Sequence, residues 1–379
     1  MNVQRLAVST AFFCQGFAFA SLITRIPAIQ DRFNFSEGGL AMILAAVPIV
    51  AGVGSVVAGL LAVRYHSAAV LRVCALIVAG GLVAVGASTT AGSFPGLLFA
   101  LALMGFGLGS VDATMNMQGI GVQAAIGRSV MVSFYAWWSL ATILGALAAS
   151  VAAATSVSLL VFFGVVAAVL VPVGLAASTR FVRSRAADEA APDPLAASAA
   201  VPWRPLLIFG VAVVAAFIID SSVSNWSALD LTDVLGATES VAALAYAAYA
   251  LAMLVGRTFA DRVVGSRGAR WVITSAGIVA GAGLLVVALA PTPLIAIAGF
   301  AVVGLGISPV LPLAFVAASH HDPGHTGIAV ARVNVGNYIG FVIGAPLVGV
   351  IGEFSSLQVG FAVLIVVALG ISATARSFD

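Results

Sequence analysis

Long apolar stretches, separated by short polar breaks, follow one another along almost the whole of the 379-residue chain. A helix that spans a lipid bilayer needs about 20 apolar residues. Twelve stretches have about this length, and each is read as a membrane-spanning helix. They cover residues 6–29, 38–61, 70–89, 95–119, 130–154, 157–177, 205–229, 239–258, 270–290, 294–317, 327–350 and 357–374. The sequence therefore predicts an all-α integral membrane protein with twelve transmembrane helices.

Composition agrees with this reading and excludes other classes of protein. Hydrophobic residues make up 62% of the chain and charged residues only 8%, whereas a soluble domain carries about 25% charged residues. Too few polar groups are present to cover a soluble surface, so a soluble enzyme, a nucleic-acid-binding protein and a disordered chain are excluded. All 16 basic residues are arginine, which also excludes chemistry that needs a lysine, such as a Schiff base.

The distribution of arginine predicts the orientation in the membrane. Basic residues concentrate in the cytoplasmic loops of membrane proteins. With the N-terminus inside, only Arg25 and Arg32 fall outside, and fourteen arginines fall on or near the cytoplasmic face: Arg5, Arg64, Arg72, Arg128, Arg180, Arg183, Arg185, Arg204, Arg257, Arg262, Arg267, Arg270, Arg332 and Arg376. We expect a multi-pass protein of the bacterial inner membrane with both termini in the cytoplasm.

The longest polar break divides the chain into two halves. It carries four arginines, three acidic residues and several prolines, a composition typical of a flexible linker. We expect an N-terminal six-helix bundle at 1–178, a cytoplasmic linker at 179–204 and a C-terminal six-helix bundle at 205–379. The two bundles are expected to be pseudo-symmetric, because Gly105-Phe106-Gly107 matches Gly304-Leu305-Gly306 and Gly145-Ala146 matches Gly344-Ala345 at the same offset.

Two six-helix halves in parallel repeat resemble the major facilitator superfamily. The signature of that family, Gly-x-x-x-Asp-Arg between helices 2 and 3, is echoed between helices 8 and 9 by residues 256–262, which end in Asp261-Arg262. The first copy, which ends at Arg64, has Val63 in place of the Asp. The resemblance implies a carrier that works by alternating access, with Arg64, Asp261 and Arg262 in a latch on the cytoplasmic side. The alternative is that these arginines only mark that side.

A narrower resemblance covers most of the chain and is to the YbjJ-like branch of bacterial facilitators, distantly similar to fucose permeases. It is carried by Arg25-Ile26-Pro27, Asp112-Ala113-Thr114-Met115-Asn116, Gly127-Arg128, Trp138-Ser139, Asn225-Trp226-Ser227 and Gly344-Ala345-Pro346. That branch has a Glu at Gln123, a His at Tyr135 and a Glu at Asp220. The first two departures each remove a titratable group, so a proton-coupling scheme that depends on them does not carry over.

Asp112 is one of the two acidic residues well inside the predicted spans. A charged side chain at the centre of a bilayer costs roughly 2.5–3.5 kcal/mol on insertion scales, which makes such residues functional candidates. Asn116 lies one turn further along the same helix face, and Gly105, Gly107 and Gly109 allow a neighbouring helix to approach closely. Asp112 and Asn116 either bind the solute, with Asp112 also accepting a proton, or make a structural hydrogen bond to a neighbouring helix.

Asp220 is the second such residue, and a polar run follows it. Ser224, Asn225 and Trp226 would suit a solute with hydroxyl groups, because amides and hydroxyls hydrogen-bond such a solute and an indole stacks on it. The alternative is an outer helix end with an interfacial tryptophan. Burial disfavours the charged carboxylate, so Asp220 is also a candidate for proton coupling.

Further candidates for solute binding are amide and aromatic side chains inside the spans: Gln15, Tyr135, Trp138, Asn334, Asn337 and Tyr338. The aromatic residues could equally serve packing. The glycines at 336, 340 and 344 form a separate stripe that can pack on another helix. Pro309 breaks the helical hydrogen-bond ladder and is a candidate gating bend, although it could also bend the helix without gating.

The sequence thus predicts a secondary active transporter that moves a small, partly polar organic solute, with protons as the expected coupling ion. It is expected to act as a monomer in the lipid bilayer, with no cofactor, no metal and no nucleic acid. His320, His321, His325 and Asp322 are read as a solvated turn. The alternatives are a lipid or amphiphile flippase or efflux carrier, or a membrane receptor that transports nothing, on the same scaffold. An integral-membrane enzyme would need an acidic or histidine cluster facing one membrane surface.

Overall fold

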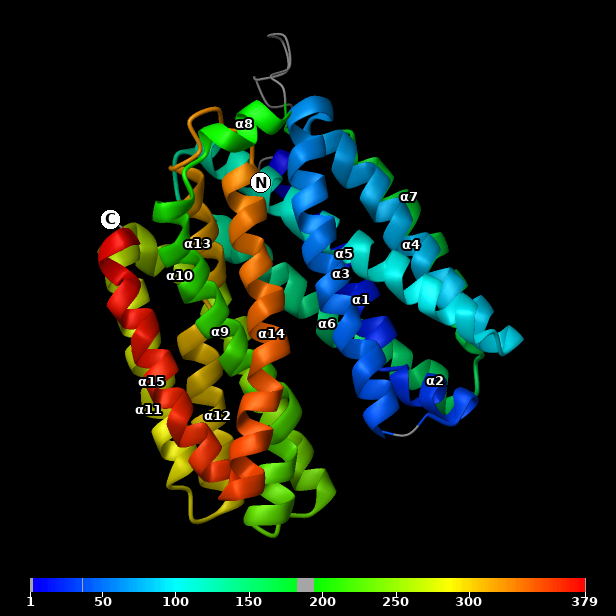
Figure 1. Ribbon diagram of the computed structural model, residues 1–379, viewed down its shortest axis with the longest axis vertical. Coiled ribbons are helices and arrows are strands. Elements are labelled where there is room, and N and C mark those ends of the chain that lie inside the picture. The colour runs from blue at the N-terminus through cyan, green and yellow to red at the C-terminus, as the bar shows by residue number, and fades with distance from the viewer. Residues whose placement is uncertain (1–2, 36, 183–193, 379) are drawn as a thin grey trace. The chain divides into compact units, whose positions relative to one another are not determined.

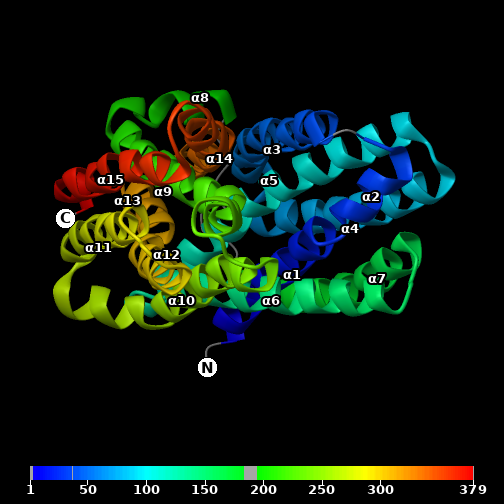
Figure 2. The same ribbon diagram turned by 90° about the horizontal axis from the view of Figure 1, so that it is seen from below.

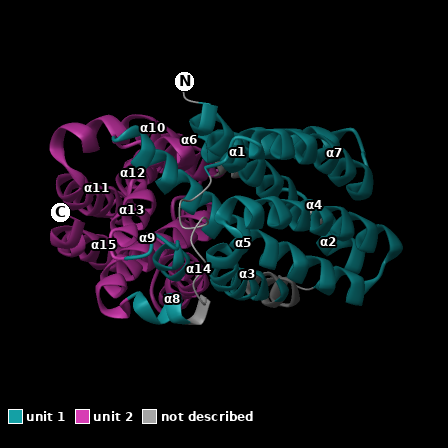
Figure 3. Ribbon diagram, turned by 90° about the horizontal axis from the view of Figure 1, so that it is seen from above, with its two compact units in different colours: residues 1–127, 137–201, 322–332 teal, residues 128–136, 202–321, 333–379 magenta. Residues whose placement is uncertain are grey.

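The computed structural model describes residues 3–35, 37–182 and 194–378, and every regular element in these residues is helical. Figure 1 shows the helices with their labels. The chain divides into two compact units, coloured in Figure 3. Unit 1 comprises residues 1–127, 137–201 and 322–332, and unit 2 comprises residues 128–136, 202–321 and 333–379.

Unit 1 is built around α1, α4, α5 and α7, which pack on one another, and α3 packs against α5. In Figure 2, α1, α4 and α7 lie beside one another. The helices that belong wholly or mainly to this unit are α1 (Val3–Ile23), α2 (Ile26–Phe33), α3 (Glu37–Tyr65), α4 (Ser67–Ala91), α5 (Phe94–Ile126), α6 (Met131–Ala154), α7 (Leu159–Ser178) and α8 (Pro194–Ala200).

Unit 2 repeats this kind of packing: α12 lies between α10 and α11, and α11 and α9 both pack on α15. In Figures 1 and 2, α11 and α15 run side by side. Its elements are α9 (Trp203–Leu229), a π-helical turn (Asp230–Val234), α10 (Glu239–Arg267), α11 (Ala269–Ala288), α12 (Pro293–Ile307), α13 (Val310–Ser319), α14 (Ile328–Phe354), α15 (Leu357–Thr374) and a final 3₁₀ turn (Ala375–Phe378).

The all-α membrane fold is confirmed. Among the described residues, eleven helices, α12 and α13 counted as one, are long and apolar enough to cross a membrane. The remaining predicted span, 239–258, coincides with the start of α10. That helix is not among the eleven, and it carries Arg257, Asp261 and Arg262. Most helix ends lie within a few residues of the predicted ends, because an apolar run of this length has no other stable form in lipid.

Three spans depart from the predicted continuous helices. The first breaks at Thr24-Arg25, where the buried Arg25 guanidinium donates from Nη2 to the backbone oxygen of Val157, 3.1 Å away. The seventh continues beyond Leu229 through a π turn. The tenth is interrupted at Ser308-Pro309, as the proline predicted, and divides into α12 and α13. In the predicted flexible linker, residues 183–193 lie outside the described residues, while 194–200 form the short helix α8.

Glycines set the closest helix contacts in both units. A Cβ on Gly109 of α5 would collide with the backbone of Ala51 on α3, and a Cβ on Gly105 would lie 2.9 Å from the backbone oxygen of Val47. In unit 2, a Cβ on Gly304 of α12 would collide with the backbone oxygen of Tyr249 on α10. The prediction that the glycines around Asp112 admit a neighbouring helix is therefore confirmed.

The glycine stripe on α14 packs against α9, as its spacing predicts. A Cβ on Gly340 would lie 2.5 Å from the backbone oxygen of Val214, and one on Gly344 would collide with the backbone of Ile218. Two serines of α9 use this close approach, because the hydroxyl of Ser221 donates to Phe341 O (2.8 Å) and that of Ser222 to Gly344 O (2.9 Å).

Candidate functional site

In unit 1, side chains from three helices converge on Asp112. Gln15 of α1 donates from Nε2 to Asp112 Oδ1 at 2.8 Å, and Trp138 of α6 donates its indole N–H to Gln15 Oε1. Gln15 is only 7% exposed. An indole N–H can only donate a hydrogen bond, so the amide oxygen of Gln15 faces Trp138 and its NH₂ group faces the carboxylate. The donor and the acceptor of each hydrogen bond in this Asp112 cluster (Gln15, Asp112, Trp138) are therefore fixed.

Small residues hold these three helices together. A Cβ on Gly16 of α1 would lie 2.7 Å from the backbone oxygen of Trp138, and a Cβ on Gly145 of α6 would lie 2.7 Å from that of Phe17. The backbones of α1 and α6 therefore approach closely enough for the Trp138 indole to reach the amide of Gln15. The sequence predicts all three members of the cluster separately, and the structure brings them together.

Asn116, predicted on the same face as Asp112, is buried and donates from Nδ2 to the backbone oxygen of Asp112 at 2.7 Å. The i,i+4 spacing thus connects Asn116 to the backbone of the residue whose carboxylate Gln15 binds. Such a bond to the carbonyl one turn earlier satisfies a buried amide inside a membrane helix.

In unit 2, a second cluster surrounds Asp220 on α9. The hydroxyl of Tyr249 on α10 donates to Asp220 Oδ1, and Tyr246, one turn before Tyr249, stacks on it with ring centroids 5.8 Å apart. Arg257 of the same helix is 7% exposed and interacts electrostatically with Asp220. Its guanidinium lies over the ring of Tyr135, 5.3 Å from the centroid, a cation–π geometry. We call these five residues the Asp220 cluster.

Arg257 was counted among the arginines on or near the cytoplasmic face, which stays a prediction, and the structure shows what surrounds this residue. The side chain is buried beside a carboxylate and an aromatic ring. Gly256 explains how α10 carries it there: a Cβ on this glycine would lie against the hydroxyl of Ser308, at the break between α12 and α13. Position along the sequence indicates a side of the membrane, but it does not indicate burial.

The polar run after Asp220 divides between two roles. Ser224 and Asn225 are exposed and hydrogen-bond the preceding turn of their own helix, to Asp220 O and Ser221 O respectively, at 2.7 Å each. Trp226, predicted to stack on a solute, donates its indole N–H to Ala345 O at 2.7 Å. A Cβ on Gly349 would lie 2.5 Å from that indole. Its indole thus contributes to the packing of α9 on α14.

The three candidates on α14 form a short polar chain. Asn337 donates from Nδ2 to Asn334 Oδ1 at 2.7 Å, and Asn334 lies 3.5 Å from the hydroxyl of Tyr338. Asn334 is fully buried, and Asn337 is nearly so. Spacings of three and four residues place all three on one face of the helix.

Asp261, the predicted latch residue, caps the start of α6 within unit 2. Its carboxylate accepts hydrogen bonds from the backbone N–H groups of Val132 (3.2 Å) and Ser133 (2.8 Å), and from the hydroxyl of Ser129 (2.6 Å). A carboxylate at this position satisfies free N–H groups and complements the positive end of the helix dipole.

The other candidates for the latch and gate have different surroundings. Arg262 is exposed and lies over the ring of Phe259, and Arg64 is exposed and lies over that of Tyr65. Val63, which replaces the family's Asp, is buried. Pro309 is buried at the interruption between α12 and α13.

The 320–325 loop has a structural role at Asp322, which is buried and accepts hydrogen bonds from Gly327 N (2.7 Å) and from the hydroxyl of Thr326 (3.0 Å). Among the residues that the structure describes, no group of three or more His, Cys, Asp or Glu side chains could hold a metal ion.

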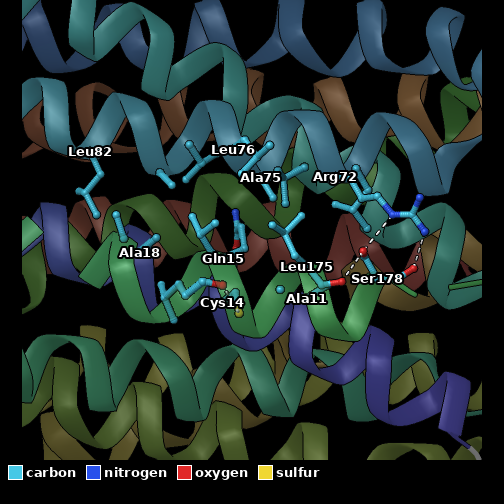
Figure 4. Close-up of a pocket in the computed structure, with 18 of the residues that line it drawn as sticks. Ala11, Cys14, Gln15, Ala18, Arg72, Ala75, Leu76, Leu82, Leu175 and Ser178 are labelled. Carbon is cyan, nitrogen blue, oxygen red and sulfur yellow. Dashed lines mark hydrogen bonds between the residues drawn. The ribbon is translucent and has the colours of Figure 1, made fainter. Parts of the chain in front are cut away.

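A cavity of about 60 Å³ lies within unit 1 between α1, α4, α5 and α7. Figure 4 shows Arg72 and Ser178 at one end, where the guanidinium donates to Ser178 Oγ (2.9 Å) and O (2.7 Å), and Leu82 at the other end. Its lining is mostly Ala, Val and Leu, and Gln15 contributes a polar group. Gln15 therefore lies between this apolar cavity and Asp112.

Sequence reasoning missed a third acidic residue inside the spans. Asp230 is fully buried, and neither carboxylate oxygen has a hydrogen-bond partner among the residues described. It was placed beyond the end of the seventh span, whereas the helix continues through the π turn that Asp230 begins. The apolar Leu231 after it was the available signal that the span continues.

Comparisons with known proteins agree with this fold. A sequence model of the Major Facilitator Superfamily matches residues 208–376. An uncharacterized MFS-type transporter of Yersinia pestis is 27% identical over 99% of this chain and 95% of its own length. Uncharacterized transporter y4wD of Sinorhizobium fredii is 28% identical over 93% of this chain and 92% of its own length.

Solved structures show the same architecture at low sequence identity. The MFS transporter FucP in the outward conformation superposes with a TM-score of 0.85 at 15% identity, over 99% of this chain and 98% of FucP. The proton:xylose symporter XylE superposes with a TM-score of 0.71 at 13% identity, over 98% of this chain and 94% of XylE.

Proposed function

Because the chain is a distant member of the major facilitator superfamily, we propose that it carries a small, partly polar organic solute across the membrane together with protons. It is a multi-pass membrane protein and a secondary transporter rather than an enzyme. The narrower YbjJ-like assignment stays a prediction, as do the inner membrane, the cytoplasmic termini and the monomeric state.

The observation that carries the proposal is the convergence of three membrane helices on the carboxylate of Asp112. A carboxylate inside a span is costly, and here a fixed amide donor holds it. The Asp112 Oδ1 atom can accept from Gln15 whether or not the carboxyl is protonated, because a protonated carboxyl keeps acceptor capacity. The cluster thus tolerates both protonation states, which a proton carrier requires.

Two of the structural neighbours are named as proton symporters, FucP for fucose and XylE for xylose. This supports proton-coupled transport of a hydroxylated solute in this chain. Asp112 in unit 1 and Asp220 in unit 2 are the proposed proton carriers. The exposed polar side chains of Ser224 and Asn225 are proposed to contact the solute.

Transport by alternating access needs contacts that form in one state and break in another. We assign this role to Asp261, since its three hydrogen bonds at the start of α6 all end on one carboxylate and can be released together. The interruption at Pro309 is proposed as a bend that moves during the cycle, and Arg64 and Arg262 as charges at the same proposed cytoplasmic surface.

The test is a solute panel in proteoliposomes with an imposed pH gradient. Wild type is expected to accumulate at least one polar solute when the solute-free side is alkaline. Asp112→Asn and Asp220→Asn should lose accumulation driven by the gradient and keep exchange of labelled for unlabelled solute. Accumulation with an unchanged pH dependence in both variants would contradict the proposed proton coupling. If the protein transports no solute of the panel, the alternative of a membrane receptor that transports nothing is favoured.

The apolar cavity beside Gln15 favours one other function, transport of an amphiphile. Its Ala, Val and Leu lining suits a hydrocarbon chain, and Arg72 at one end suits an anionic head group. Under this alternative, translocation of a fluorescent lipid should depend on the cavity, and Ala75→Phe should reduce it. Polar-solute transport that Ala75→Phe leaves unchanged favours the first proposal.

A further inference from the structure

We propose that the Asp220 cluster recognises an anionic group, so that the solute is a small hydroxylated organic acid that binds Arg257 when Asp220 is protonated. The inference rests on the proposed function, and it adds the chemical class of the solute. It is drawn from the position of one buried arginine inside unit 2 and from the groups around it.

The geometry places one buried cation beside one partly buried anion. Arg257 is 7% exposed, lies over the ring of Tyr135, and interacts electrostatically with Asp220. Tyr249 donates its hydroxyl to Asp220 Oδ1, which keeps the carboxylate in place beside α10. An arginine stays protonated in proteins, so Asp220 is the member of the pair whose charge can change.

Few other groups can balance this charge. In the helices that pack against α9, the elements α12, α13 and α15 contain no acidic or basic residue at all. The π turn that follows α9 carries Asp230 and Asp233. On α10, the titratable groups that interact with Asp220 are Arg257, Tyr249 and Tyr246. On α14, the titratable residues are Arg332, Tyr338 and Glu353. Protonation of Asp220 therefore leaves the positive charge of Arg257 without its carboxylate counter-ion.

Charge balance then couples the proton to an anion. With Asp220 ionised and no solute, the Asp220–Arg257 pair is neutral. With Asp220 protonated and a carboxylate solute on Arg257, the site is neutral again. The two intermediate forms, with the proton alone or the anion alone, carry a net charge of plus one or minus one. Because an uncompensated charge is costly to bury, only the two neutral forms should cross between states.

The surroundings of the cluster suit the hydroxyl groups of such a solute. The side chains of Ser224, Asn225 and Tyr246 are exposed beside Asp220 and Arg257, and Tyr246 also interacts with Ser224. A guanidinium offers two parallel N–H donors that match a carboxylate. A sugar acid carries both kinds of group, whereas a neutral sugar would leave Arg257 with no anion to bind.

The first experiment compares matched solutes in proteoliposomes that hold the full-length protein: glucose with gluconate, and galactose with galacturonate. We expect a pH gradient to drive at least one acid about tenfold or more faster than its neutral partner, since a lost charge interaction of this kind changes affinity by that much or more.

Variants distinguish proton coupling at Asp220 from anion binding at Arg257. Asp220→Asn, a permanently neutral side chain, should keep exchange of the acid at all pH values and lose its accumulation. Arg257→Lys should retain part of the exchange. Arg257→Gln alone leaves the Asp220 carboxylate without its counter-ion and could fail to fold, so the double variant Asp220→Asn/Arg257→Gln, whose site is neutral, is the decisive one. It should fold and lose exchange of the acid, while the exposed Arg267→Gln control stays like wild type.

The outcomes distinguish this inference from the proposed function. Proton-driven transport of the neutral sugars at rates equal to those of the acids would overturn the inference and leave the transporter proposal intact. Exchange of the acid that persists in the folded double variant would also overturn it. If the pH gradient moves neither acids nor sugars, both the inference and the proton-coupled transport fail.

Discussion

At the scale of single residues, the amide of Gln15 fixes the hydrogen bonding of the Asp112 carboxylate. Gln15 receives the indole N–H of Trp138 and gives its own N–H to Asp112. The oxygen and the NH₂ group of the Gln15 amide cannot change places, because the indole of Trp138 cannot accept a hydrogen bond. This directed pair is why Gln15, a neutral residue, belongs to the proposed proton site.

Gln15→Leu removes the donor to Asp112 and keeps a side chain of similar length. We expect the variant to fold and its rate of proton-driven solute uptake to fall about tenfold, the effect of losing one hydrogen bond of about 1.5 kcal/mol to a charged group. The measurement is initial uptake in proteoliposomes at several pH values. Gln118→Leu serves as a control for loss of a buried amide away from the cluster, and an equal loss in both variants would contradict the proposed role of Gln15.

Asp230 presents the opposite situation, a buried carboxylate whose oxygens have no hydrogen-bond partner in the described part of the chain. Replacing it by an uncharged residue of the same shape removes a buried charge. We expect Asp230→Asn to raise the free energy of unfolding by about 1–3 kcal/mol at pH 8, because a buried neutral amide costs less than a buried carboxylate that no group pairs.

Thermal unfolding in detergent measures this effect, with the exposed neighbour Asp233→Asn as the control. A lower melting temperature for Asp230→Asn would mean that the carboxylate has a stabilising partner, and the expectation would then be wrong.

At the scale of helices, some features could be predicted from sequence and others could not. The spans were predictable because lipid leaves an apolar stretch only the helix. The break at Pro309 was predictable from the missing backbone donor. The break at Arg25 was not, because the carbonyl of Val157 that binds this side chain lies 132 residues away. The Asp112 cluster was also only partly predictable. The free-energy cost of a charge inside the bilayer singles out Asp112, but its partner Gln15 lies 97 residues earlier in the chain.

Asp261 caps the start of α6, and removal of its carboxylate should make the start of this helix more mobile. Asp261→Ala deletes three hydrogen bonds, and we expect a loss of about 1–2 kcal/mol in the stability of the capped arrangement. The backbone amides of Val132 and Ser133 should then exchange faster with solvent in Asp261→Ala. Arg262→Ala, which leaves the cap in place, is the matched control, and equal exchange rates in both variants would contradict the latch.

At the scale of the whole molecule, each unit contains one acidic cluster and one glycine-rich helix crossing, at Asp112 with Gly109 and at Asp220 with Gly304. The two glycine crossings agree with the predicted pseudo-symmetry of two halves. The two acidic residues are not equivalent, because the offset of 199 residues carries Asp112 to Leu311. The division into six-helix bundles at 1–178 and 205–379 stays a prediction. Sequence reasoning could assign each acidic residue to a helix, but it could not show that Arg257 is buried beside Asp220, since burial depends on the packing of α10 against α12.

The linker helix α8 is held within unit 1 by Arg332, whose guanidinium donates to Val201 O (2.6 Å), Ser198 O (2.6 Å) and Ser198 Oγ (2.8 Å). We expect Arg332→Ala to release α8, with at least about tenfold faster amide hydrogen exchange over residues 194–201, because loss of two or more hydrogen bonds to a charged group favours local opening. Arg267→Ala should leave the exchange unchanged. Protection of α8 that is equal in all three proteins would show that other contacts hold the helix.

Coupled movement of solute and protons is the central claim, and it can be measured without any imposed gradient. Proteoliposomes are loaded with a pH-sensitive dye, and the best solute of the panel is added outside at equal pH. We predict that solute entry acidifies the lumen in wild type, and that Asp112→Asn and Asp220→Asn exchange solute without acidification. Solute entry into wild-type vesicles with a constant internal pH would contradict the account.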